Sequence, residues 1–437
     1  MRSFPRAVLA LVLTALMAVG ASAPAFAEHT TSDERDFMSQ NIGAGGAWKW
    51  SEQSSPHASA PAGDLRVATY NVALNRAAEG DLVSDLTSPN NAQAQAVAEV
   101  IQRTNPDVVL LNEFDYDEGH EAAGLFRDNY LAAGQNGQDG VSYPYMYTAP
   151  SNTGVPIGAD LDGDGTVGGA ADSFGFGDFP GQFGMVLYSK YPILQDQVRT
   201  FQGFLWKDMP NNLMPAGYYG PLVRNVFRLS SKSHWDVPVD VHGETVHLVA
   251  AHPTPPVFDG AERRNARRNH DEIRLLNDYV AGGRAASYIY DDSGKTGGLR
   301  AGERFVVLGD LNADPVNGDS YRGAVNKLLA NPDLTDPLPS SNGAAARVTG
   351  TGSTSGAPEL LPKDTSNGAA PLRTADFSGS AGPLRVDYVL PSRTLAVGAA
   401  GVFWPAAGED GADLVDGTPS RTSDHRLVWV DVGLSGS

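Results

Sequence analysis

The chain has no cysteine among its 437 residues. This absence excludes thiol catalysis, cysteine-ligated zinc and disulfide bonds, so the fold must depend on the size of its core and on any bound metal. Basic residues are also few, because 32 Lys and Arg face 51 Asp and Glu and give a net charge of −19. Such a chain has no overall attraction to polyanions, so a phosphate-bearing substrate must be held by local cations or by metal.

Long apolar runs are confined to the first residues. Arg2 and Arg6 flank the start of an apolar run from Ala7 to Val19, and Ala25-Phe26-Ala27 offers a small-residue cleavage site. This pattern predicts a signal peptide over residues 1–27 and therefore a secreted, extracellular protein. The alternative is an N-terminal membrane anchor, for which the run is short. We expect no integral membrane association of the mature chain.

The rest of the sequence divides into a lead-in and one long domain. Residues 28–63 are rich in Ser, Gly, Ala and Pro, which predicts a flexible N-terminal segment. Residues 64–433 alternate irregularly between apolar runs and helical spacing, which predicts a layered α/β protein with a mixed sheet core. The predicted strands are Arg66–Tyr70, Asp107–Leu111, Phe183–Tyr188, Thr245–Ala251, Phe305–Leu308, Val386–Leu390 and Leu427–Val432, and the predicted helices are Ala92–Arg103 and Glu262–Val280.

Three segments of this domain have the composition of insertions. Residues 114–182 are rich in Gly and Asp, residues 202–222 carry Pro, Gly, Tyr and Trp, and residues 338–380 are dominated by Ser, Gly, Ala and Thr. Such compositions predict surface loops, and long loops of this kind often decide substrate access.

Polar residues suited to metal or proton chemistry stand at the edges of the predicted strands. Taken singly, each also fits a structural role such as a turn former, a solvated carboxylate or a cap. A carboxylate at the edge of an apolar run costs free energy unless it finds a cation or donors, and several such edges on one rim would make a site for magnesium, calcium or manganese. The residues are Asn71, Glu113, His252, Asp310, Asn312, Asp387, Asp424 and His425.

In this order the residues resemble the endonuclease/exonuclease/phosphatase superfamily, which includes deoxyribonucleases, abasic-site nucleases, inositol polyphosphate phosphatases and neutral sphingomyelinases. The resemblance extends over residues 64–433, apart from the insertions. It implies a four-layer α/β sandwich of two packed mixed β-sheets flanked by helices, with an active site at one rim. The matching stretches are Thr69–Asn71, Asp107–Glu113, Val249–Pro253, Gly309–Asn312, Arg385–Tyr388 and Ser423–His425.

The resemblance also implies a metal-dependent hydrolase that acts on phosphate esters. Glu113 would be the main ligand of Mg²⁺, or of Mn²⁺ or Ca²⁺, with help from Asn71 and Asp424. These oxygen donors suit a hard divalent cation.

The remaining matched residues would carry the catalytic roles. Asp310 would orient or deprotonate the attacking water, and Asn312 would hold a phosphate oxygen beside it. His425 would donate a hydrogen bond or proton to the phosphate while Asp387 fixes its tautomer. His252 resembles the second histidine of the deoxyribonuclease and sphingomyelinase branches.

Cationic residues outside the matched stretches are candidates for substrate binding. Arg224, Lys232 and His234 lie between two matched strands and could contact a second phosphate or the leaving group, although a solvated charge on an edge strand is the alternative for Lys232. Arg264 and Arg268 share a face at helical spacing, and we interpret that face as solvated.

A separate motif lies in the first insertion. Asp160, Asp162 and Asp164, followed by Gly165, match the first half of a calcium-binding loop. The twelfth position is Ala171 where a bidentate Glu is expected. A structural calcium site and an acidic surface loop are therefore both open.

The sequence predicts a secreted phosphodiesterase for which extracellular DNA or RNA is the favoured substrate. His252 and the signal peptide favour a nuclease, whereas the acidic charge opposes one. The alternatives are a phosphatase or phosphodiesterase of a small phosphorylated metabolite or a lipid head group, and a non-catalytic, calcium-dependent binding module. Because no coiled coil or assembly arm is evident, we expect a monomer.

Overall fold

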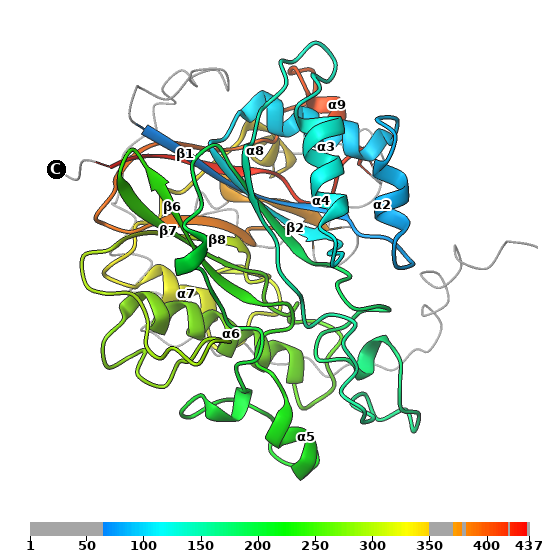
Figure 1. Cartoon of the computed structure of the whole chain (residues 1–437), viewed down its shortest axis with the longest axis vertical. Coiled ribbons are helices and arrows are strands. Elements are labelled where there is room, and N and C mark those ends of the chain that lie inside the picture. The colour runs from blue at the N-terminus through cyan, green and yellow to red at the C-terminus, as the bar shows by residue number, and fades with distance from the viewer. Residues whose placement is uncertain (1–63, 349–369, 378–381, 418–419, 435–437) are drawn as a thin grey trace, which may run out of the picture. The chain divides into compact units, whose positions relative to one another are not determined.

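The predicted strands form, and they assemble into two large sheets. The computed structural model describes residues 64–348, 370–377, 382–417 and 420–434 (Figure 1). The predicted signal peptide, the lead-in and much of the 338–380 insertion lie outside these residues. The described residues belong to one compact unit, Ser55–Ser437.

The first sheet has six strands in the order β12-β13-β1-β2-β4-β3. Its two central strands, β1 and β2, run parallel, and the remaining neighbours pair antiparallel. The strands are β1 (Asp64–Leu74), β2 (Val108–Phe114), β3 (Tyr145–Tyr147), β4 (Met185–Ser189), β12 (Ala396–Val402) and β13 (Val428–Gly433).

The second sheet has five strands in the order β11-β8-β7-β6-β5. Here β7 and β8 run parallel and the other pairs are antiparallel. The strands are β5 (Arg199–Thr200), β6 (His234–Val241), β7 (Glu244–Ala251), β8 (Arg304–Asp310) and β11 (Asp387–Pro391). A separate two-stranded ribbon joins β9 (Ala375–Phe377) to β10 (Gly382–Leu384).

The two sheets pack face to face, and helices cover their outer faces. Strand β8 illustrates the alternation: Val306 and Leu308 belong to the core shared with β1 and β2, whereas Phe305 and Val307 pack in the cluster that contains α6. Figure 1 shows α3 and α4 on one side of the strands and α6 and α7 on the other. The architecture is therefore helix, sheet, sheet, helix, and it confirms the predicted four-layer α/β sandwich.

Both predicted helices form with small shifts at their ends. The helix that begins near Ala92 extends to Thr104, with the Asn91 side chain accepting a hydrogen bond from Ala94 N as an N-cap. The helices are α2 (Asp81–Leu86), α3 (Ala92–Thr104), α4 (Glu121–Phe126), α5 (Pro221–Val226), α6 (Arg264–Ala281), α7 (Ala324–Leu329), α8 (Asn342–Val348) and α9 (Ala412–Val415).

Segments predicted as surface loops contain regular structure as well. The 114–182 segment holds α4 and β3, and β6 forms although Pro238 lies in its middle. The short helical turns are η1 (Arg127–Leu131), η2 (Ala170–Asp172), η3 (Gln195–Gln197), η4 (Trp206–Asp208) and η5 (Ala370–Leu372). Over the part of the chain that the structure describes, no helix combines the length and apolarity needed to cross a bilayer.

Pairing within the two sheets brings distant polar residues to one edge of the sandwich. Asn71 on β1 is the register partner of Asn112 on β2, and Asp310 on β8 is the partner of Asp387 on β11. Strands β1 and β2 both pack on β8, so these two edges meet. Gly309 allows the close approach of β8 to β7, because a Cβ there would lie 1.9 Å from Ala251 O and the backbone has φ of +144°.

Candidate active site

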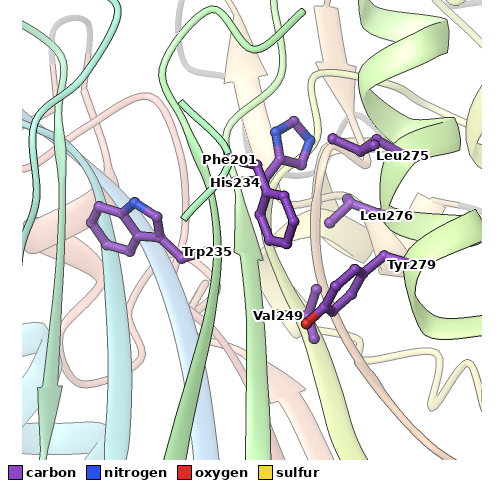
Figure 2. Close-up of a pocket in the computed structure, with 7 residues that line it drawn as sticks. All are labelled: Phe201, His234, Trp235, Val249, Leu275, Leu276 and Tyr279. Carbon is purple, nitrogen blue, oxygen red and sulfur yellow. The ribbon is translucent and has the colours of Figure 1, made fainter. Parts of the chain in front are cut away.

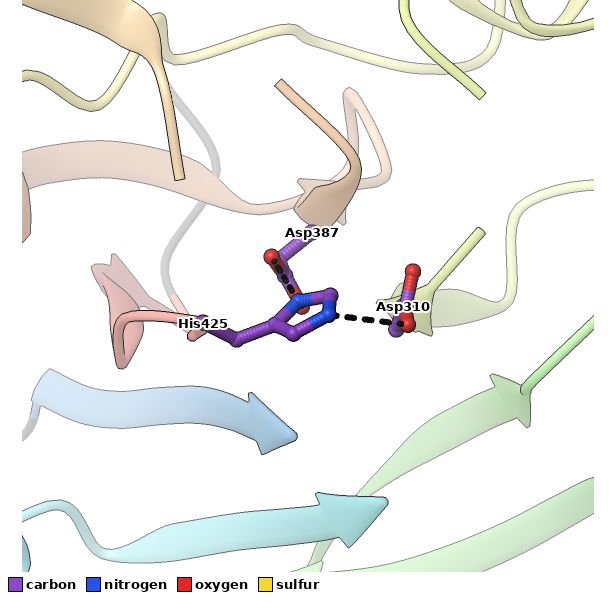
Figure 3. A group of neighbouring side chains, drawn as sticks. All are labelled: Asp310, Asp387 and His425. Atoms are coloured by element: carbon purple, nitrogen blue, oxygen red, sulfur yellow. Dashed lines mark hydrogen bonds and ion pairs between the residues drawn. The ribbon is translucent and has the colours of Figure 1, made fainter. Parts of the chain in front are cut away.

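Three buried side chains form the centre of the site. His425 lies between Asp387 and Asp310, as Figure 3 shows, with Nδ1 2.9 Å from Asp387 Oδ2 and Nε2 3.7 Å from Asp310 Oδ2. All three side chains are at most 4% exposed. Two carboxylates that face each other across paired strands repel, so the imidazolium between them offsets the repulsion.

Strand β9 fixes this group from behind. Thr374, which precedes β9, donates its hydroxyl to Asp387 Oδ2 at 2.7 Å and accepts the backbone N–H of Val386 and of Asp387 at 3.0 Å. The Phe377 ring stands edge-on to the His425 ring at 5.2 Å between centroids. The tautomer of His425 is therefore set by Asp387, and the position of Asp387 is set by Thr374.

The pKa values of the three groups support a charged trio at neutral pH. Burial alone lowers the pKa of His425, but the negative charges of Asp387 and Asp310 overcome it and raise the pKa to about 10. Burial raises the pKa of Asp310, yet His425 and His252 hold it below its ordinary value. Burial raises the pKa of Asp387 to about 6 against the pull of His425. Asp310 is thus the carboxylate that stays ionised into acid.

His252 and Asn312 complete the face of the site built by the second sheet. His252 Nε2 lies 3.4 Å from Asp310 Oδ2, and neither ring nitrogen of this buried side chain has a hydrogen-bond partner among the described residues. Asn312 donates its side-chain N–H to Pro253 O at 3.1 Å, and its backbone N–H bonds Asp310 Oδ1 at 2.8 Å. A buried imidazole with two unpaired nitrogens needs a further partner.

Asn71 and Glu113 form the face built by the first sheet. Asn71 Nδ2 donates to Glu113 Oε1 at 3.0 Å and to Asp310 Oδ2 at 3.1 Å, so it joins the two faces. Asn75 donates to Glu113 Oε2 at 3.1 Å. Glu113 has φ of +57°, a left-handed conformation that is strained for a non-glycine residue and that turns its side chain out of the strand.

This donor set fits a hard divalent cation. The Glu113 carboxylate contacts only amide donors, and within the described part of the chain no Lys or Arg pairs with it. The N and O atoms of an asparagine amide are assigned from the hydrogen-bond network. When such an amide turns about its C–C bond, its oxygen takes the position that its nitrogen held, and it can then bind a cation. Asp424, the third predicted ligand, has an exposed side chain that accepts a weak bond from Ser423 Oγ at 3.5 Å.

Lys232 is buried beside the site, which corrects the alternative of a solvated edge charge. Its residue is 7% exposed. Burial lowers the pKa of Lys232 while the charges of Glu113, Glu272 and Asp310 raise it, and the same lysine lowers the pKa of His252. Lys232 is therefore a buried basic residue on which the charges of Glu113, Glu272 and Asp310 act.

His234 and Arg224 are not brought to this cluster. His234 Nδ1 lies 2.5 Å from Ser230 Oγ and Nε2 lies 3.0 Å from Glu272 O, so both nitrogens are used inside the fold. The cavity beside His234, of about 10 Å³ and lined largely by apolar side chains, is too small for a substrate (Figure 2). Arg224 is exposed on α5, which projects away from the strands in Figure 1.

The two helix arginines differ, which corrects the interpretation of a solvated face. Arg264 pairs with Glu262 and remains partly exposed. Arg268 is buried and donates to the backbone carbonyls of Leu229 at 2.7 Å and Ser230 at 3.0 Å. The guanidinium of Arg268 therefore fastens the loop that leads to Lys232.

The acidic loop of the first insertion closes around Asp172. One oxygen each of Asp160, Asp162 and Asp172 lies within 4.8 Å of the others, whereas Asp164 is not in this group. Asp172 already accepts the backbone N–H of Leu161 at 2.6 Å and of Gly168 at 2.9 Å. Calcium binding at this loop stays a prediction.

Several residues of the site carry no signal in the sequence. Thr374 and Phe377 lie in a segment that looks like a loop, and only their contacts identify them. Arg373, next to Thr374, is 6% exposed, and its Nη1 has no hydrogen-bond partner among the described residues. A signal for Asn75 was present in principle, because it follows Asn71 by four residues at the end of β1.

The four-layer fold and this group of carboxylates, amides and histidines define a phosphoester hydrolase. The chain belongs to the Endonuclease/Exonuclease/phosphatase family, whose model matches residues 68–425. Members of this family hydrolyse phosphate esters, often with a divalent metal, and the protein is accordingly an enzyme of this class. A search of curated proteins finds no match.

Solved structures of similar proteins include three bacterial examples. An endonuclease/exonuclease/phosphatase from Beutenbergia cavernae is 19% identical, with a TM-score of 0.43, and the match covers 85% of this chain and 72% of that one. A variant of beta toxin from Staphylococcus aureus with bound magnesium ions is 15% identical (TM-score 0.39; 84% and 99% covered). Sphingomyelinase C from Streptomyces griseocarneus is 18% identical (0.39; 84% and 99%).

Proposed function

We propose that the protein is a magnesium-dependent phosphodiesterase whose substrate is compact, with one phosphodiester group bound in the site. The observation that carries the proposal is the meeting of Asn71, Asp310 and His425, which come from three distant parts of the chain, within one buried hydrogen-bonded and ion-paired group. Buried charges in this arrangement cost stability, and groups of this kind are concentrated at functional sites.

The residues divide the reaction between them. Asp310, ionised and flanked by His252 and His425, accepts the proton of the attacking water. His425, protonated and oriented by Asp387, donates a hydrogen bond to a phosphoryl oxygen and neutralises charge that develops there. Asn312, beside Asp310, donates a hydrogen bond to a second phosphoryl oxygen once its side chain has released its hydrogen bond to Pro253 O.

Glu113 and Asn71 would hold the divalent cation, with Asp424 at the solvent side. The bound ion would supply positive charge that offsets the charge of the phosphate. Mg²⁺ fits the oxygen donors best, and Mn²⁺ is the closest substitute. Lys232, buried next to Glu113 and Asp310, supplies the protein's own positive charge on the same side of the site.

The charges around the site favour a compact substrate over a long polyanion. Arg264 and Arg76 are paired with acidic neighbours, and Arg268 is buried against backbone carbonyls, so none of the three is free to follow a phosphate backbone. A net charge of −19 adds general repulsion. A small ester or a lipid head group presents only one phosphate and needs only the local cations.

Extracellular nucleic acid is the second candidate substrate, and His252 is the observation that favours it. Two histidines whose Nε2 atoms both approach Asp310 Oδ2, at 3.4 and 3.7 Å, can contact both non-bridging oxygens of a phosphodiester, which suits a nuclease. A single strand threaded past the site would need fewer cations than a duplex.

We also propose that the protein is exported and that the mature chain begins after residue 27. The support is the charged start, the apolar run and the Ala-Phe-Ala site of the sequence. N-terminal sequencing of protein recovered from the medium of the producing cells tests this. A first residue well upstream of Glu28 would contradict it.

The function is tested with bis-p-nitrophenyl phosphate and Mg²⁺. We expect the wild type to hydrolyse it, and Asp310→Ala and His425→Ala to be about 10²–10⁴-fold slower. A wild type no faster than both variants would contradict hydrolysis. With activity established, relative rates on plasmid DNA, single-stranded RNA, inositol phosphates and sphingomyelin decide between the compact substrate and nucleic acid.

A further inference from the structure

Helix α6 carries a row of buried polar side chains on the face that it turns to the second sheet. Asn269 and Glu272 are 0% exposed and Arg268 is 6% exposed, although neighbouring buried residues of α6 such as Ile273 and Leu276 are apolar. Burying an amide and a carboxylate costs free energy unless both are bonded. Their partners are backbone groups of the loops that carry the catalytic residues.

Asn269 joins two of these loops. Its Nδ2 donates to Thr254 O and to Leu311 O, both at 2.9 Å. Thr254 follows His252 by two residues, and Leu311 follows Asp310 directly. One side chain thus fixes the separation between the segments that bear His252 and Asp310.

Glu272 joins the first of these loops to a third one. Its Oε1 accepts Ser231 N and its Oε2 accepts Thr254 N, both at 2.7 Å. Ser231 directly precedes Lys232. The carboxylate therefore ties the lysine segment to the His252 segment, and both of its oxygens are used.

His252 also depends on this support. Neither of its nitrogens makes a hydrogen bond of good geometry within the described residues, and its one polar side-chain contact is the long approach of Nε2 to Asp310 Oδ2 at 3.4 Å. Its place is set by the backbone on either side, and Thr254 is bonded to Asn269 through its carbonyl and to Glu272 through its N–H.

We propose that Asn269 and Glu272 are positioning residues of the active site, which hold His252, Asp310 and Lys232 in register from the α6 side. This inference rests on the proposed phosphodiesterase function. Neither residue touches the substrate. Loss of either one therefore changes the rate at which bound substrate reacts more than it changes the affinity for substrate.

Steady-state kinetics on bis-p-nitrophenyl phosphate test the proposal, with Asn269→Ala and the isosteric Glu272→Gln compared with Asn277→Ala. Asn277 lies on the same helix and bonds Asn331, away from the catalytic loops, so it is a matched control. We expect kcat to fall about 10–100-fold for Asn269→Ala and Glu272→Gln, with KM changed less than about threefold. We expect Asn277→Ala to keep wild-type kcat.

A double-mutant cycle with His252→Ala separates positioning from a general loss of structure. If Asn269 and Glu272 act through His252, the further loss that Glu272→Gln causes in the His252→Ala background shrinks to a few-fold. Mg²⁺ affinity measured by calorimetry should match the wild type, because Glu113 lies on the other sheet. Folding is checked by circular dichroism, and Glu272→Gln keeps the test open if Asn269→Ala is unfolded.

Three results would overturn the inference. They are a kcat for Glu272→Gln equal to that of Asn277→Ala, effects of Glu272→Gln and His252→Ala that simply multiply, and a rise in KM with unchanged kcat. A wild type inactive with every metal would instead refute the proposed function, and calorimetry would still report whether the metal site is intact.

Discussion

At the scale of single residues, the centre of the proposed active site is His425, which shares charge with two aspartates. Asp387 supplies the hydrogen bond at 2.9 Å, and Asp310 supplies a second negative charge at 3.7 Å. The two together raise the pKa of His425 to about 10, so the imidazolium persists through neutral pH. The site therefore holds a buried cation that is a histidine.

The pH dependence of the activity follows from the raised pKa of His425. The reactive form needs protonated His425, so activity is present below the folded pKa of about 10 and is lost as the pH rises through it. The Asp387→Asn variant lacks the charge that raises the pKa of His425 most. We therefore expect the alkaline limb of its kcat profile to move to lower pH. An alkaline limb at the same pH in both proteins would contradict the role of Asp387.

The charge interaction of His425 with its aspartates also makes the stability of the fold depend on pH. The pKa of His425 is higher in the folded protein than its ordinary value of 6.5, so the stabilisation is complete below about pH 6.5 and is lost as the pH rises toward 10. Urea unfolding of the wild type and of His425→Gln should therefore differ most at pH 6 and least above pH 10. A constant difference would exclude the charge coupling.

Thr374 stabilises the fold through hydrogen bonds that the sequence does not suggest. Its hydroxyl donates to Asp387 and accepts two backbone N–H groups, so Thr374→Val leaves three buried polar groups with one partner fewer. We expect a loss of about 1–3 kcal/mol in the free energy of unfolding, measured with urea. A loss below about 0.5 kcal/mol would show that water replaces the hydroxyl.

At the scale of secondary-structure elements, the approach of β8 to β7 depends on one glycine. A methyl group at Gly309 would meet the carbonyl oxygen of Ala251 at 1.9 Å, and that carbonyl belongs to backbone that cannot move alone. We expect Gly309→Ala to cost at least about 1–3 kcal/mol and to lower kcat, because His252 and Asp310 follow the two crowded residues directly. Unchanged stability and kcat would show that the strands separate freely.

The central elements were predictable from the sequence because their apolar runs are long and end in polar residues. Strands β1, β2, β7 and β8 form where the runs predict them, and the predicted α3 and α6 form as well. Strand β6 was missed because Pro238 and two aspartates interrupt its pattern, and β12 because its residues are mostly exposed Ala and Gly. Strands of this kind are specified by their neighbours rather than by their own composition.

The predictability of the site divides in the same way. The residues that we propose for the reaction centre stand at strand ends and could be predicted from the sequence. The residues that hold them, such as Thr374 and Asn269, act through contacts that no spacing reveals. Lys232 and His234 show the limit within one short segment. Both were candidates on equal grounds. Only packing places Lys232 where the charges of Glu113 and Asp310 act on it, and His234 against the backbone of α6.

At the scale of the whole molecule, the strongly acidic net charge limits what can bind. The net charge of −19 repels extended polyanions, and the repulsion weakens as salt screens it. We expect the rate on a small diester to change little between 50 and 300 mM NaCl. A steep fall with rising salt, measured on any substrate, would instead indicate a cationic groove and favour nucleic acid.

In the proposed reaction, Glu113 on one sheet acts together with Asp310 and His425, which lie beside the other, in one metal-assisted step. The most direct measurement is hydrolysis of bis-p-nitrophenyl phosphate against Mg²⁺ concentration for the wild type and Glu113→Gln. We predict saturable activation of the wild type, none in excess EDTA, and at least about tenfold more Mg²⁺ for half-activation of Glu113→Gln. Full wild-type activity in EDTA, or identical Mg²⁺ curves for the two proteins, would contradict it.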